Sequence, residues 1–129
     1  LPVRYPVLTQ FSHRAFPWGD TYDGTQSGTK NGTYLSVGQK LTDRSPFGVL
    51  DMAGNVWEWC SDWYGDYPKG AVSDPVGPRE GSSRVLRGGS WNGTAGYCRS
   101  ASRGGNYPSS RSNDSGNCGF RVSLSPSGK

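Results

Sequence analysis

Several kinds of residue and segment are missing from this sequence, and each absence excludes a class of function. No apolar run approaches the roughly 20 residues of a membrane-spanning helix, and no signal-like stretch opens the chain, so we expect no membrane span. The formal net charge is +4, but the arginines are scattered without a dense basic run, so nucleic acid is not an expected partner. Histidine occurs once, as His13.

Cysteine is also scarce. Cys60, Cys98 and Cys118 show no metal-binding spacing such as C-x-x-C. An odd number of cysteines leaves at least one thiol unpaired within a monomer. Any disulfide pairing among the three, and the redox compartment of the protein, therefore stay open.

Small residues and large aromatic residues dominate what is present. Only 32% of the 129 residues are apolar, while there are 20 Gly, 9 Pro, 5 Trp and 7 Tyr. A chain of this length fits one compact domain with one core. Its stability must then depend on a few large aromatic side chains set among many turns, and long helices are not expected.

One short helix and three strands are predicted from the apolar patterns. Residues 6–15 have a spacing compatible with a short helix, whereas residues 18–43 are rich in Gly, Thr, Asp and Asn and should be irregular. Strands are predicted over 56–60, 83–91 and 119–124, where bulky residues alternate. These strands would place Trp57 and Trp59 in or near the core and Phe120, Val122 and Leu124 on one face.

The two later predicted strands enclose a segment with very little side chain. Between Asn92 and Asn117, fifteen of the 26 residues are Gly, Ser or Asn. The same segment contains no Lys, Glu, Gln, Met or Trp, although residues 1–91 contain fourteen of them. At that frequency a segment of this length would hold about four residues of these five types. Their absence indicates either that the codons of this segment have an unusual origin or that the segment is an ordinary Gly/Ser-rich loop.

Five motifs in order resemble a known family. "FPWGD", "GVLDMAGNVWEWCSDWY", "RVLRGGSW", "CRSASR" and "GFRV" resemble the formylglycine-generating enzyme or sulfatase-modifying-factor domain, between Phe16 and Leu124. The resemblance implies one α+β domain over residues 1–129 with a C-type lectin-like fold of the formylglycine-generating-enzyme subtype. The region before Phe16 is short compared with full members, so we expect a minimal version with short strands, much irregular loop and few helices.

The catalytic machinery of that family is incomplete here. Formylglycine-generating enzymes oxidise a substrate cysteine with two copper-binding cysteines five positions apart, shortly after the "GGS" block. Cys98 falls on the second position, but Gly93 occupies the first. Related sulfoxide synthases need several histidines, and His13 stands alone. We therefore expect no enzyme and no required cofactor; the alternative is a degenerate oxidase that uses Cys98.

The segment after "GGSW" resembles instead the variable proteins of diversity-generating retroelements. In those systems a reverse transcriptase randomises template adenines, so that an AAY codon for Asn becomes any NNY codon, and NNY codons never encode Lys, Glu, Gln, Met or Trp. The resemblance implies a non-catalytic receptor, displayed on a virus or cell surface, that binds an unknown protein or surface ligand. The implied ligand-binding residues are Asn92, Gly93, Thr94, Gly96, Tyr97, Ser102, Gly104, Gly105, Asn106, Tyr107, Ser110, Ser112, Asn113, Asp114 and Asn117.

The composition of this segment suits a binding surface. Tyr, Ser, Gly and Asn are enriched in antibody paratopes, where tyrosines give large contact areas at low entropic cost. Tyr97 and Tyr107 would be the anchors. Arg99, Arg103 and Arg111 would hold the backbone if they pair with carbonyls or acids beneath the surface; otherwise they are solvated.

The family resemblance also implies a calcium site. The resembling enzymes hold calcium at the segment that matches "DMAGNVWE", which here would involve Asp51, Glu58 and the carbonyls of Gly54 and Val56. The alternative is that Glu58 accepts hydrogen bonds from backbone amides and no metal binds. Sugar binding through calcium is disfavoured, because neither the E-P-N nor the Q-P-D tripeptide of sugar-binding relatives occurs.

Overall fold

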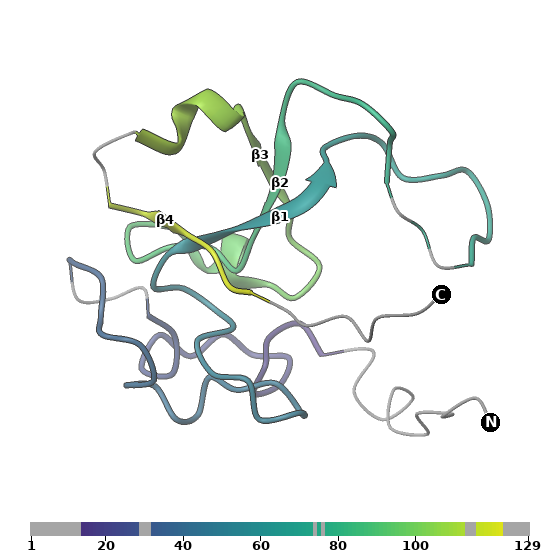
Figure 1. Ribbon diagram of the computed structural model, residues 1–129. Coiled ribbons are helices and arrows are strands. Elements are labelled where there is room, and N and C mark those ends of the chain that lie inside the picture. Colours follow the sequence, from purple (N-terminus) through teal and green to yellow (C-terminus); the bar gives the residue numbers. More distant parts are fainter. Residues whose placement is uncertain (1–13, 29–31, 74, 76, 113–115, 123–129) are drawn as a thin grey trace.

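A twisted sheet of four short strands forms the centre of the molecule (Figure 1). The structure is a computed structural model that describes residues 14–28, 32–73, 75, 77–112 and 116–122. Its strands are β1 (Trp57–Trp63), β2 (Arg84–Arg87), β3 (Gly104–Asn106) and β4 (Cys118–Gly119), in the sheet order β3-β2-β1-β4. Two 3-10 helices complete the list, η1 (Ala95–Cys98) and η2 (Pro108–Ser112).

The register of the sheet places the tryptophan-rich strand in the middle. β1 runs antiparallel to β2, with Trp59 opposite Leu86, and parallel to β4, with Trp57 opposite Cys118. β3 adds to the outer side of β2, with Gly105 opposite Val85. Because Val85 and Leu86 are both buried, β2 is covered on both faces and holds the sheet in place.

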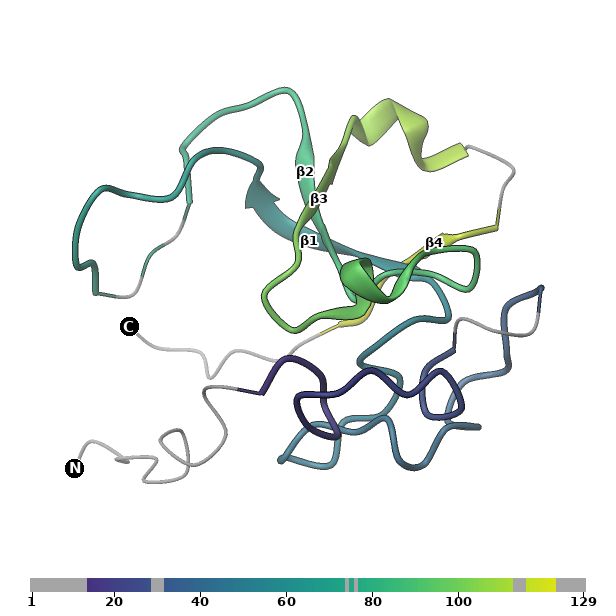
Figure 2. The same cartoon turned by 180° about the vertical axis from the view of Figure 1, so that it is seen from behind.

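Residues 14–28 and 32–56 pack beneath the sheet and contain no helix or named strand. Figures 1 and 2 show these loops on the side of the sheet opposite η2. Their backbone is closed by two isolated bridges, Phe16 with Gly19 and Arg44 with Leu50. The irregular structure expected over residues 18–43 is confirmed where the chain is described.

A small core joins these loops to the segment after β2. Phe16, Ala53 and Cys98 are buried together, and Trp18 and Tyr22 pack against them. The Phe16 and Trp18 rings are stacked with centroids 5.6 Å apart. One part of this core therefore comes from the "FPWGD" motif and another from the segment that follows "GGSW".

Gly54 and Asn55, the "GN" pair before β1, pack very closely against the backbone of Gly28. A Cβ on Gly28 would lie 2.4 Å from the backbone nitrogen of Asn55, and one on Gly54 would lie 2.7 Å from the nitrogen of Gly28. Gly54 has φ of +89°, and Gly28 donates a hydrogen bond of 3.1 Å to Ala53 O. Only glycine fits at these two crossing points.

Two predictions about elements need correction, and a third is not tested by the described residues. The strand predicted over 119–124 is wrong beyond Gly119, because the pairing ends there and Phe120 and Val122 are 77% and 87% exposed; Leu124 lies outside the described residues. The helices among the described residues are 3-10 turns, so the α part of the predicted α+β class is not seen. The helix predicted over 6–15 lies outside the described residues except for Arg14 and Ala15.

The strands predicted over 56–60 and 83–91 are confirmed in part. The first runs from Trp57 to Trp63 and the second from Arg84 to Arg87. The second strand ends where Gly88 and Gly89 adopt φ of +90° and +75°. Sequence patterns missed β3, because its sequence, GGN, has no strand-forming side chain.

Candidate ligand-binding surface and the Arg121 cluster

The segment after "GGSW" forms one edge of the sheet and then continues to the opposite edge. It passes through η1, pairs as β3 with β2, forms η2 and then reaches β4 (Figure 2). Trp57 N donates a hydrogen bond of 2.7 Å to Asn117 O, so the end of the segment is fixed to the start of β1. The segment is therefore attached to the sheet at β3 and at its end.

The predicted ligand-binding residues differ in how much of each side chain reaches the surface. Exposed residues are Asn92, Thr94, Gly96, Tyr97, Gly105 and Tyr107, while Gly93, Ser102, Gly104, Asn106, Ser110 and Asn117 are half-buried. The side chain of Ser112 and all of Asn113 and Asp114 lie outside the described residues. The structure thus places about half of the described set in contact with solvent.

The two predicted tyrosine anchors have different supports. Tyr97 is 52% exposed and its ring packs against Trp57 of β1, with centroids 5.5 Å apart and planes tilted by 59°. Tyr107 is 57% exposed and follows directly on β3, where its backbone nitrogen donates to Asn106 Oδ1 at 2.9 Å. The Tyr97 ring is therefore held at one side and free at the other, as a contact anchor requires, whereas the bond at Tyr107 holds its backbone.

Two of the predicted positions have side chains that also support the local backbone. Asn92 Oδ1 accepts a hydrogen bond of 2.7 Å from the hydroxyl of the buried Ser90. Asn106 Oδ1 accepts from the backbone of Tyr107. Substitution at either position would remove a local hydrogen bond, in addition to changing the surface.

The four glycines of the predicted set have unlike surroundings. A Cβ on Gly96 would meet nothing closer than 3.8 Å, and one on Gly104 would make ordinary contacts of 3.5 Å with Trp57 and Leu86. A Cβ on Gly93 would lie 3.2 Å from Ser90 O. A Cβ on Gly105 would lie 2.9 Å from the ring of Tyr64. Gly96 is thus an open position, whereas Gly105 is closed by a neighbouring side chain.

Of the three arginines expected to hold the backbone, Arg103 is the one for which the structure shows a long-range backbone contact. Arg103 donates a 3.0 Å hydrogen bond to Gly65 O, and its guanidinium lies 3.9 Å from the centroid of the Tyr67 ring and 5.0 Å from that of Tyr64. Arg99 makes only a local bond of 3.2 Å to Gly96 O. The side chain of Arg111 is not described.

Sequence reasoning missed two contributors to this frame. Arg87 of β2 donates to Ser102 O, and Tyr64, just beyond β1, packs on Gly105. The only sequence signal was their position within the motifs "RGGSW" and "CSDWY". Neither motif shows which way a side chain points.

Cys98 is buried beneath this surface. Its side chain is 1% exposed, and a Cβ on Gly89 would lie 2.9 Å from its Sγ. Burial, reinforced by the negative charge of Asp43, raises the pKa of the Cys98 thiol to about 11. A thiol protonated at neutral pH is a poor nucleophile and a poor metal ligand. Within the described residues the three cysteines are free, and no group of three His, Cys, Asp or Glu is placed to hold a metal.

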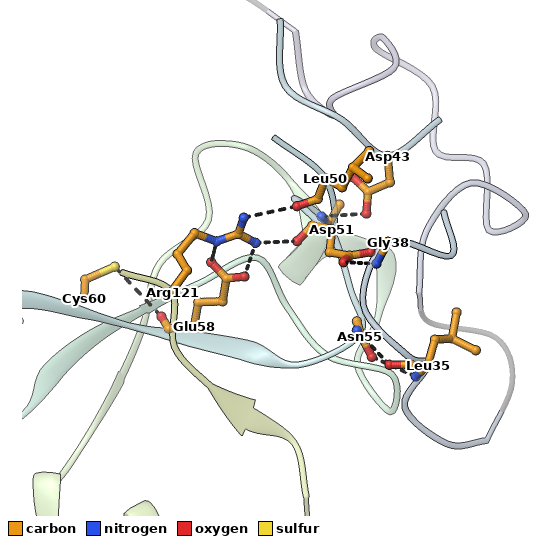
Figure 3. A network of polar contacts seen from close by, with 10 residues as sticks. Leu35, Gly38, Asp43, Leu50, Asp51, Asn55, Glu58, Cys60 and Arg121 are labelled. Atoms are coloured by element: carbon orange, nitrogen blue, oxygen red, sulfur yellow. Dashed lines mark hydrogen bonds and ion pairs between the residues drawn. The ribbon is translucent and has the colours of Figure 1, made fainter. Parts of the chain in front are cut away.

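The four residues of the predicted calcium site do come together, but with an arginine among them. Asp51, Gly54, Val56 and Glu58 line one cavity, which Arg121 also lines. Figure 3 shows the Arg121 guanidinium between the Glu58 carboxylate and the carbonyls of Leu50 and Asp51. The hydrogen bond with Glu58 raises the pKa of Arg121, which keeps the guanidinium charged.

The fold and these motifs define the class of protein. The chain matches the family described as "Sulfatase-modifying factor enzyme 1-like domain" over residues 2–125 and belongs to that family, with its C-type lectin-like fold. The structure is similar to Treponema denticola variable protein 1, with a TM-score of 0.66 and 35% identity, covering 81% of this chain and 39% of that one.

Curated relatives include enzymes. The formylglycine-generating enzyme of Thermomonospora curvata is 32% identical over 96% of this chain and 44% of its own length. The "Inactive C-alpha-formylglycine-generating enzyme 2" of Mus musculus is 30% identical over 87% of this chain and 37% of its own. This chain therefore spans less than half the length of these relatives.

No helix in the described part of the chain is long and apolar enough to cross a membrane.

Proposed function

We propose that this chain is a non-catalytic, ligand-binding variable protein of a diversity-generating retroelement, whose ligand is selected by side chains between Asn92 and Asn117. The observation that carries the proposal is the exposure of Thr94, Gly96 and Tyr97 around η1 and of Tyr107 after β3. The first three lie on the turn that connects β2 with β3, and Tyr107 directly follows β3. New side chains there would change the surface without entering the core.

The frame beneath the surface would keep the cost of binding low. Ordering a flexible loop on binding consumes part of the interaction energy, so a surface held in advance binds more tightly. Here the fixed supports are the bond from Arg103 to Gly65, the bond from Arg87 to Ser102 and the packing of Tyr97 on Trp57. The variable side chains would then act as a paratope rich in Tyr, Ser, Gly and Asn.

Similarity to a variable protein supports the same proposal. The likeness to Treponema denticola variable protein 1 extends over 81% of this chain. The absence of Lys, Glu, Gln, Met and Trp between Asn92 and Asn117 fits the NNY codons that adenine randomisation produces. By the same analogy the ligand is a protein or another surface molecule, and the receptor is displayed on a virus or a cell.

The genome beside the coding sequence provides the decisive test. We expect a reverse transcriptase gene and a near-copy of the 3' end of this gene that differs only where the copy carries adenine. The differing codons should fall between Asn92 and Asn117 and spare those of Arg99 and Arg103. A neighbourhood without such a copy would contradict the proposal.

The second candidate function is a degenerate oxidase that uses Cys98, and the similarity to formylglycine-generating enzymes is the observation that favours it. The burial and the raised pKa of Cys98 argue against it. We expect purified protein to form no formylglycine on cysteine peptides of the sulfatase type, with or without copper. Turnover that disappears in Cys98→Ser would establish the oxidase instead.

A further inference from the structure

Arg121 joins three parts of the chain that are far apart in sequence. It follows β4 and donates to both carboxylate oxygens of Glu58 on β1. It also donates to Leu50 O at 3.1 Å and to Asp51 O at 3.0 Å, in the loop that leads to β1. Four donor interactions therefore fix one guanidinium among oxygen atoms (Figure 3).

These oxygen atoms belong to the cavity where the family resemblance places calcium. Calcium takes six to eight oxygen ligands, and a carboxylate is usually among them. Of the two carboxylates here, that of Glu58 is occupied by Arg121 on both oxygens, and Asp51 Oδ2 accepts a 2.7 Å hydrogen bond from Gly38 N. The residues present therefore do not fit a calcium ion while Arg121 is in place.

Charge leads to the same result. The guanidinium and the Glu58 carboxylate balance each other, and a bidentate pair of this kind is among the strongest side-chain hydrogen-bond arrangements. A divalent ion bound to Glu58 would lie beside a fixed positive charge and would be repelled by it. Arg121 and a divalent cation thus need the same carboxylate and exclude each other.

We propose that Arg121 is the resident cation of this site: its guanidinium takes the place of calcium, ties Glu58 to Leu50 and Asp51, and must leave before a divalent cation can bind. The loop before β1 and the chain after β4 are then held together without metal. This inference does not depend on the proposed ligand-binding function, because it concerns only the frame.

Thermal unfolding with excess EGTA or excess Ca²⁺ tests the proposal in the full chain. The melting temperature of the parent protein should be the same in both solutions. Arg121→Gln removes the charge but keeps an amide, so its melting temperature should fall by several degrees in EGTA and recover in Ca²⁺. Calorimetric titration should show Ca²⁺ binding to Arg121→Gln and none to the parent.

Two matched variants serve as controls. Arg121→Lys keeps a positive charge beside Glu58, so it should gain no response to Ca²⁺. Adding Glu58→Gln to Arg121→Gln removes the carboxylate and should abolish the gained response. A parent protein that loses stability on chelation would overturn the proposal, and this measurement needs no variant. Folded Arg121→Gln without Ca²⁺ binding would overturn it as well.

Discussion

Asp43 carries a buried carboxyl group that makes stability depend on pH. Its side chain is 1% exposed; Oδ2 accepts a 2.9 Å hydrogen bond from Ala53 N, and Oδ1 has no partner among the described residues. Burial, reinforced by the negative charge of Asp51, raises its pKa from 3.8 to about 7. The folded protein therefore keeps a proton that the unfolded chain loses near pH 4.

The stability contributed by this proton is complete below about pH 4 and disappears as the pH rises through about 7. Asp43→Asn keeps an acceptor for Ala53 but cannot ionise. Between about pH 5 and about pH 8 the parent should lose roughly 2 kcal/mol more unfolding free energy than Asp43→Asn. Urea unfolding at the two pH values measures the difference. Parallel dependence of the unfolding free energy on pH in the two proteins would contradict the raised pKa of Asp43.

Gly96 and Gly105 provide a second prediction at the scale of single residues. A side chain on Gly96 enters open space, so Gly96→Ser should change the unfolding free energy by at most about 0.5 kcal/mol. A side chain on Gly105 meets the Tyr64 ring at 2.9 Å, so Gly105→Ser should cost about 1 to 3 kcal/mol.

A double variant identifies the cause of the Gly105 effect. Tyr64→Ala removes the ring that Gly105 contacts, so Gly105→Ser should cost less in that background than in the parent. Denaturant unfolding of the four proteins of this cycle measures the interaction. An equal cost in both backgrounds would show that the backbone, and not Tyr64, excludes the side chain.

At the scale of elements, the two strands at the centre of the sheet matter more than the segment after β4. Trp57 of β1 contacts Tyr97 and lies 3.5 Å from the Cβ position of Gly104, whereas Phe120 is 77% exposed. Trp57→Ala should therefore cost about 2 to 3 kcal/mol, below the cost for a fully buried ring, and Phe120→Ala at most about 0.5 kcal/mol. If chemical denaturation shows a similar loss of unfolding free energy for Trp57→Ala and Phe120→Ala, the Phe120 ring is covered in solution.

The elements that could be predicted are those whose own side chains form a pattern. The bulky run from Trp57 and the run "RVLR" predicted β1 and β2. β3 could not be predicted, because its pairing with β2 depends on the open edge of that strand and not on the side chains of Gly104 and Gly105. The alternation of apolar and polar residues after Gly119 predicted a strand, but the pairing of β4 with β1 ends at Gly119.

The candidate site was predictable to a similar degree. The codon argument and the family motifs located the exposed segment, and the motifs located the oxygen-rich cavity near Glu58. The sequence did not reveal that Arg121 would occupy that cavity, since Arg121 and Glu58 are 63 positions apart. The exclusion of a side chain at Gly105 by Tyr64 likewise depends on tertiary packing alone.

At the scale of the whole molecule, the frame and the proposed recognition surface are separable. The frame consists of the sheet, the loops beneath it that are held by the Phe16 core, and the arginines that bind backbone carbonyls. The open positions are the exposed turns after β2 and after β3. This division predicts that binding can change while the protein stays folded, at a limited cost in stability.

Simultaneous replacement of the open positions tests that division. Thr94, Gly96, Tyr97 and Tyr107 would be changed together to other residues encoded by NNY codons, with Gly105 and the arginines kept. Surface substitutions away from special features usually cost little, so the four together should change the unfolding free energy by at most about 2 kcal/mol, most of it from the lost packing of Tyr97 on Trp57. Selection of a displayed library at these positions against purified proteins should yield binders with different targets, whereas a matched library at Trp57, Leu86 and Arg103 should yield mainly unfolded chains. Unfolding of most members of the first library would show that the segment is a structural loop and not a recognition surface.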